Sequence, residues 1–129
     1  MNSRGFVTLV SVIIVGAIAL TVVLSLSFLS ITSSKNAVAL VKTNQAKALA
    51  GACAERALDL IRQTSSYTGT NNLTLGAGTC SATVTNTGGT TRQIVSTGTV
   101  GVIIKKIKIL VSALTPKITL SSWREVADF

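Results

Sequence analysis

Residues 6–31 read FVTLVSVIIVGAIALTVVLSLSFLSI, and this run of 26 residues contains no charged side chain. A helix of that length extends roughly 39 Å at about 1.5 Å per residue, whereas about 20 apolar residues suffice to cross a bilayer. The apolar region of a cleaved secretory signal has only about 7–15 residues. The length of the run therefore favours a retained membrane anchor. Arg4 precedes it, which predicts a cytoplasmic N-terminus and an extracytoplasmic C-terminal part.

Small and hydroxylated residues interrupt this apolar run. Small side chains let helices approach one another closely inside a membrane. A single spanning helix also tolerates them, so composition alone leaves open whether the helix packs on others. The positions that would carry such packing are Ser11, Gly16, Ala17, Thr21 and Ser25.

The composition of the chain narrows the class of function. The 129 residues carry a formal net charge of +8, with no His and only four acidic side chains. Metal sites and general acid–base catalysis need His or grouped carboxylates. We therefore expect a protein that is not an enzyme and that uses no metal, cofactor or small-molecule substrate.

Helical spacing continues beyond the apolar run. Apolar positions recur at steps of three and four residues, which places them on one stripe of a helix. The stripe consists of Val38, Val41, Gln45, Leu49, Cys53, Ala57, Leu60 and Ile61. We expect one helix from about Phe6 to Gln63, with an ion pair between Asp59 and Arg62. A break near residues 32–34 would instead give two helices.

From Leu73 onward, short β segments replace the helical pattern. Residues 78–85, GTCSATVT, alternate in polarity, and Cys80, Ala82 and Val84 share one face. Turns are expected at residues 86–89, NTGG, and at residues 115–116, TP. The segment at residues 117–126, KITLSSWREV, is expected to form a last strand that reaches Trp123.

In residues 100–111 the alternation of apolar and polar side chains shifts by one residue. Val100, Val102 and Ile104 share one face of the expected strand. After Lys105 and Lys106, the apolar positions are Ile107, Ile109 and Val111. A slip of one residue is what a β-bulge produces, so we expect a bulge at residues 105–106. The whole pattern predicts an α+β fold: a long N-terminal helix, half apolar and half amphipathic, packed on an antiparallel sheet of three or four strands.

The two cysteines fit this arrangement. Cys53 lies on the helix stripe and Cys80 on the inward face of the first main strand. A disulfide between them would fix the sheet to the helix and, through the loop that it closes, contribute roughly 3–4 kcal/mol. Two unpaired buried thiols are the alternative.

The positive charge of the chain allows a binding function. A module that contacts DNA or another polyanion would use Arg92, Lys105, Lys106 and Lys108. The few aromatic residues disfavour nucleic acid, because stacking on aromatic side chains usually accompanies such contacts. A solvated exterior is the simpler interpretation of the same charges.

Residues 4–10, RGFVTLV, resemble the processing region of type IV pilins and pseudopilins. In that family a short basic leader ends in Gly, a Phe follows, and a long apolar helix continues into an amphipathic helix and a small antiparallel sheet. The opening run and residues 50–58, AGACAERAL, also look like minor members of the family, such as PilX-like minor pilins. The specific sequence signal is confined to the first of these segments.

The resemblance implies a processing pathway and a set of partners. A prepilin peptidase would cut between Gly5 and Phe6 and methylate the new N-terminus at Phe6. The chain would then divide into a leader (1–5), a transmembrane and assembly helix (6–31), an amphipathic half (32–64) and a β domain (65–129). The implied partners are other pilin or pseudopilin subunits, the prepilin peptidase and the membrane. The protein would be a single-pass cytoplasmic membrane protein that reaches a pilus or the cell surface after assembly.

Val10 departs from the family pattern. Most pilins have Glu at this place, where the carboxylate pairs with the N-terminal ammonium of a neighbouring subunit. Here the first acidic residue is Glu55. The resemblance therefore implies a minor subunit, as in tip pseudopilins, which lack the same Glu. The family's usual helix-kinking proline is missing as well, since Pro116 is the only proline.

Overall fold

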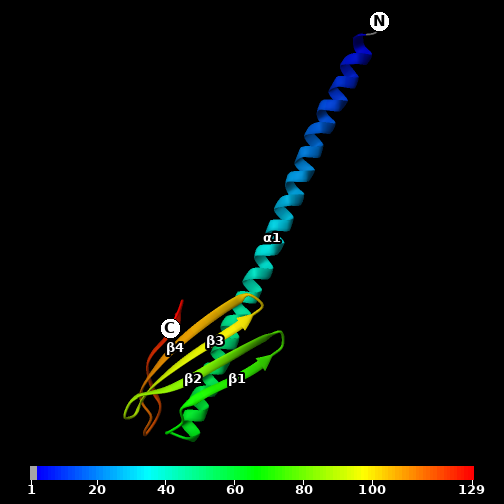
Figure 1. Ribbon diagram of the computed structural model, residues 1–129. Coiled ribbons are helices and arrows are strands. Elements are labelled where there is room, and N and C mark those ends of the chain that lie inside the picture. The colour runs from blue at the N-terminus through cyan, green and yellow to red at the C-terminus, as the bar shows by residue number, and fades with distance from the viewer. Residues whose placement is uncertain (1–2) are drawn as a thin grey trace. The chain divides into compact units, whose positions relative to one another are not determined.

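A computed structural model describes residues 3–129 of the chain. One helix, α1 (Ser3–Gln63), precedes five strands: β1 (Gly69–Leu75), β2 (Gly78–Gly88), β3 (Thr91–Val100), β4 (Ile103–Ala113) and β5 (Thr119–Val126). The strands pair antiparallel in chain order, so β1 and β5 form the two edges of the sheet (Figure 1). The predicted α+β fold, a long N-terminal helix packed on an antiparallel sheet, is confirmed.

The sheet has five strands, which corrects the prediction of three or four. Strand β1 has the sequence GTNNLTL, whose Gly, Thr and Asn residues favour turns as much as strands. Its seven residues nevertheless pair with β2 without a register shift. Tertiary pairing therefore decides the conformation of this segment.

The predicted β-bulge at Lys105 and Lys106 is wrong. These two residues pair with Gly98 and Thr97 in an uninterrupted register. The phase change has another cause: Val100 ends β3, Ile103 begins β4, and a two-residue turn at residues 101–102 joins them. Gly101 has a φ of 61°, which is the conformation that such hairpin turns require at their first position. The register shifts occur elsewhere, near the end of β2 and between β4 and β5.

The chain forms two compact units, the first ending at Ala39 and the second spanning Leu40–Phe129. We call them the N-terminal unit and the C-terminal unit and describe each by itself. In the N-terminal unit the described residues are helical, and nearly all side chains are exposed. The C-terminal unit contains the remainder of α1, all five strands and the hydrophobic core.

The core of the C-terminal unit is built on small helix residues. Ala46, Ala50, Ala54 and Ala57 are fully buried against the sheet. Facing them, Gly98 of β3 has no side chain, and a Cβ atom there would lie 2.1 Å from the carbonyl oxygen of Ala46. The helix backbone thus contacts the strand backbone directly, which is possible only where both surfaces lack bulk.

The predicted helix stripe is partly wrong. Leu49, Cys53 and Ile61 are buried as expected, but Val38 and Val41 are about half exposed. Packing on the sheet begins only at Ala46, so the first members of the stripe have no sheet to cover them. The predicted ion pair between Asp59 and Arg62 is not formed, and the carboxylate of Asp59 accepts a hydrogen bond from Gln63.

Candidate functional site

The N-terminal half of α1 is the most conspicuous surface of the protein. It is the one helix, among the described residues, that is long and apolar enough to cross a membrane, and none of its most apolar window is buried. Phe6 and Phe28 each expose about 70% of their surface. Exposed apolar patches of this size mark membrane or protein contacts, because the surfaces of soluble monomeric proteins rarely carry them.

Several hydroxyl groups on this helix donate hydrogen bonds to its own backbone. Thr8, Ser11, Thr21 and Ser25 each donate to a backbone carbonyl three or four residues earlier, at 2.8–3.1 Å. These four hydroxyls therefore have partners without water, which is the condition for polar side chains of a helix in lipid or in a dry helical bundle.

The predicted packing residues do not all lie on one face. Ala17, Thr21 and Ser25 follow one another at steps of four, and Ser11 lies about 40° from Ser25 around the helix axis. Gly16 lies about 140° from Thr21, at about 100° of rotation per residue. The regular helix therefore presents one row of small residues, with Gly16 on a separate side.

The predicted processing junction lies near the start of α1. Gly5 and Phe6 are helical and exposed in the described chain. A Cβ atom at Gly5 would meet nothing within 4 Å, so contacts inside the chain do not require glycine there. Val10 lies one helical turn further on, and its half-buried, apolar side chain brings no charge to this segment.

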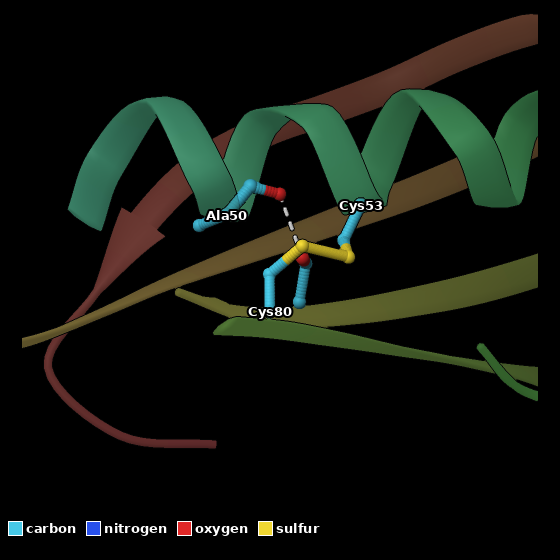
Figure 2. Close-up of a disulfide and its surroundings, with 4 residues drawn as sticks. Ala50, Cys53 and Cys80 are labelled. Atoms are coloured by element: carbon cyan, nitrogen blue, oxygen red, sulfur yellow. Dashed lines mark hydrogen bonds between the residues drawn. A yellow bond between two sulfur atoms is a disulfide. The ribbon is translucent and has the colours of Figure 1, made fainter. Parts of the chain in front are cut away.

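The predicted disulfide is present. Cys53 of α1 and Cys80 of β2 are bonded, with a Cα–Cα distance of 6.0 Å and a sequence separation of 27 residues. Figure 2 shows the bond between the helix and the sheet, beside a hydrogen bond that the carbonyl of Ala50 accepts. The donor is the hydroxyl of the fully buried Ser96, at 2.7 Å. A covalent bond and a buried hydrogen bond thus fix the helix to the sheet side by side.

The four predicted polyanion contacts are not brought together. Arg92 exposes only 6% of its surface, and its guanidinium donates to the carbonyls of Ser65, Gly89 and Thr91 at 2.9 Å. Arg92 therefore holds the segment just after α1 and the β2–β3 turn in place. A residue so engaged cannot also contact a polyanion.

The three lysines divide between the two faces of β4. Lys105 faces the helix side and forms a salt bridge with Glu125 at 2.8 Å. Lys106 lies on the opposite face, where it forms a salt bridge with Asp128 and lies 5.1 Å from the centre of the Phe129 ring. Lys108 shares that face with Arg124, its neighbour on β5. The four predicted residues consequently form no single basic patch.

Glu125 joins the helix to the edge of the sheet. Its carboxylate also forms a salt bridge with Lys47 of α1 at 3.1 Å. Hydrogen bonds from Lys105, and then from Lys47, lower the pKa of Glu125, and a hydrogen bond from Lys106 lowers the pKa of Asp128. A lowered folded-state pKa stabilises the fold above the ordinary carboxyl pKa, and this contribution is lost as the pH falls through the lowered value.

We therefore expect the C-terminal unit to lose stability below about pH 4, and Glu125→Gln to remove part of that pH dependence. The effect should be small, because these groups are exposed to solvent. Chemical denaturation at pH 7 and at pH 3 checks it. Glu55→Gln is the matched control, since Glu55 makes no salt bridge among the described residues. Equal pH dependence in wild type and Glu125→Gln would contradict this expectation.

Several residues that hold α1 against the sheet were missed by the sequence analysis. Gly98, Ser96 and Arg92 contact α1 or the segment just after it, but no local pattern separates them from other strand residues. The alternation of β3 is the one signal available, since all three lie on its inward face. Over residues 3–129, no group of three His, Cys, Asp or Glu side chains is placed to hold a metal ion.

Comparison of the chain with protein-family models, with curated proteins and with solved structures finds no match. The fold and the exposed apolar helix are therefore the observations from which function has to be inferred.

Proposed function

We propose that this protein is a minor pilin-like structural subunit of a type IV pilus or a type II secretion pseudopilus. One observation carries the proposal: the stretch of α1 that follows Arg4 is exposed, uncharged and of membrane-spanning length, and the same α1 supports the sheet of the C-terminal unit. An anchor alone would not need to continue as the scaffold of the exported domain. A subunit that leaves the membrane and assembles through its helix does need that continuity.

The physical basis of assembly is the burial of this apolar surface. In the membrane, lipid covers residues 6–31, and after extraction only other apolar helices can cover them at comparable free energy. Each buried large side chain contributes about 1.5–3 kcal/mol relative to exposure in water. The row formed by Ala17, Thr21 and Ser25 allows a neighbouring helix to approach closely, because these side chains are small and their hydroxyls are already satisfied.

Gly5 supports the proposed processing. No contact within the chain requires glycine at this position, since a Cβ atom there would meet nothing within 4 Å. A peptidase that reads the backbone at the bond between Gly5 and Phe6 would explain the residue. Phe6 would then become the N-terminus of the mature subunit and the site of methylation.

The apolar residue Val10 supports a position for this subunit outside the repeating shaft of the filament. A subunit without a carboxylate here offers no ion pair to the N-terminal ammonium of a neighbour, and a membrane-buried carboxylate is costly unless it is paired. The residues before Glu55 supply no other acid. Such a subunit fits the end of a filament or an initiation complex better than the repeating shaft.

Co-expression with a prepilin peptidase tests the processing step. We expect the wild-type chain to shorten when the peptidase is active and Gly5→Leu to stay at its original length. Gly16→Leu is the matched control, because Gly16 also lies in open space on the same helix and should leave cleavage unchanged. A wild-type chain whose length does not respond to the peptidase would contradict the proposal and favour a simple signal-anchored surface protein.

A further inference from the structure

A cavity of about 420 Å³ opens at the end of the C-terminal unit where α1 finishes. The last turn of α1 and the β4–β5 connection form its walls, with Ile61, Leu114 and Ile118 as the apolar part. The volume falls within the range of small-ligand sites, about 300–1,000 Å³. These side chains give the body of a ligand an apolar surface to contact.

Positive charge surrounds this cavity. Arg62 and Lys117 line it, and neither forms a salt bridge among the described residues. Arg92 adds a third cation behind the wall, because it donates to the carbonyl of Ser65, a lining residue, at 2.9 Å. Its Nε atom is buried and makes no hydrogen bond.

No acidic side chain among the described residues lines this cavity. Glu125 and Asp128 are bound to lysines elsewhere. Asp59, three residues before Arg62 on α1, forms no salt bridge with it and accepts a hydrogen bond from Gln63. The carboxyl end of α1 opposes the cations with about half of a negative charge. One of the last carbonyls, that of Leu60, already accepts a hydrogen bond from the backbone of Thr64. Two full positive charges at the cavity and a third behind it exceed the carboxylate of Asp59 and that half charge together, so the cavity attracts anions.

We propose that this cavity binds a carboxylate attached to a small apolar group. The planar guanidinium of Arg62 suits a carboxylate, which it can bind through two parallel hydrogen bonds. The ammonium of Lys117 and the hydroxyls of Ser65 and Thr115 add donors at the same cavity. The apolar wall covers the body of the ligand, a contact that inorganic phosphate or acetate cannot make. This site is independent of the proposed assembly role, since it uses residues of the C-terminal unit alone.

Three small probes separate the parts of this proposal. N-acetyl-leucine carries the carboxylate and an apolar side chain, N-acetyl-leucinamide lacks the charge, and acetate lacks the apolar body. The full chain in mild detergent is titrated with each, and the methyl NMR signals of its isoleucines are followed. We expect saturable shifts at Ile61 and Ile118 with N-acetyl-leucine only.

Charge variants complete the test. Lys117→Gln should raise the Kd for N-acetyl-leucine about tenfold, the loss of one charge-assisted hydrogen bond. Arg62→Gln should raise it at least as much, because it removes both parallel hydrogen bonds of the guanidinium. Lys108→Gln, on the outer face of β4, should leave it unchanged. Unaltered methyl signals of the buried Ile94 and Ile109 show that a variant is folded. Equal binding of the amide or of acetate, equal weakening by Lys108→Gln, or no saturable shift at Ile61 and Ile118 would overturn the proposal.

A carboxylate on a small apolar group is found both at the carboxyl terminus of a protein and in a free small acid. A short peptide that ends in leucine distinguishes these two ligands. Binding at least as tight as that of N-acetyl-leucine assigns the site to the carboxyl terminus of a protein. Exclusion of the peptide assigns it to a free small acid.

Discussion

Gly98→Ala should unfold or severely destabilise the C-terminal unit. The added Cβ atom would lie 2.1 Å from the carbonyl oxygen of Ala46 and 2.5 Å from the amide nitrogen of Ala50. Both atoms belong to the helix backbone, which cannot rotate away as a side chain can. Overpacking usually costs about 1–3 kcal/mol and sometimes more, and a backbone clash belongs at the upper end. Chemical denaturation of the full chain in mild detergent, followed by the fluorescence of Trp123, measures the loss.

Gly51→Ala is the matched control for this variant. Gly51 lies on α1 within the same unit, and a Cβ atom there would meet nothing within 4 Å. Alanine favours the helix over glycine by up to about 1 kcal/mol, so this variant should be unchanged or slightly stabilised. Equal stability of Gly98→Ala and Gly51→Ala would show that helix and strand do not touch as described.

Removal of the disulfide should have an effect of similar size. The double variant Cys53→Ala with Cys80→Ala should lose roughly 3–4 kcal/mol, because opening a loop of this length returns chain entropy to the unfolded state. Domains of this size are stable by only about 5–15 kcal/mol in total. The loss therefore represents a large share of the stability of the C-terminal unit.

A reducing agent supplies the control for the disulfide prediction. It should lower the stability of the wild type toward that of the double variant and leave the double variant itself unchanged. The same denaturation assay measures both proteins with and without the agent. A double variant as stable as the oxidised wild type would contradict a structural role for the bond.

Local patterns predicted the elements that local interactions determine. The long uncharged run and the helical spacing after it predicted α1 almost to its ends, since each residue contributes to the same period. The alternation of residues 80–84 placed Cys80 on the inward face, and this made the bond to Cys53 predictable. The exposed apolar helix, on which the proposed function rests, was visible in the sequence as well.

Features that depend on contacts between distant residues could not be predicted from the sequence. The approach of Gly98 to Ala46 depends on how the whole sheet lies on the helix, and nothing around Gly98 distinguishes it from Gly101 three residues later. Arg92 looked like a surface cation until its three carbonyl partners were in place. The cavity near Ile61 joins segments about 50 residues apart, so only the tertiary structure reveals it.

The intact mass of the native protein, purified from its own cells, tests the central claim most directly. We expect a chain that lacks the Met1–Gly5 peptide, begins at Phe6 and carries one additional methyl group at its N-terminus. A chain that retains Met1, or one that begins after residue 30, would contradict it. The first result would indicate an unprocessed anchor, and the second a signal that is removed.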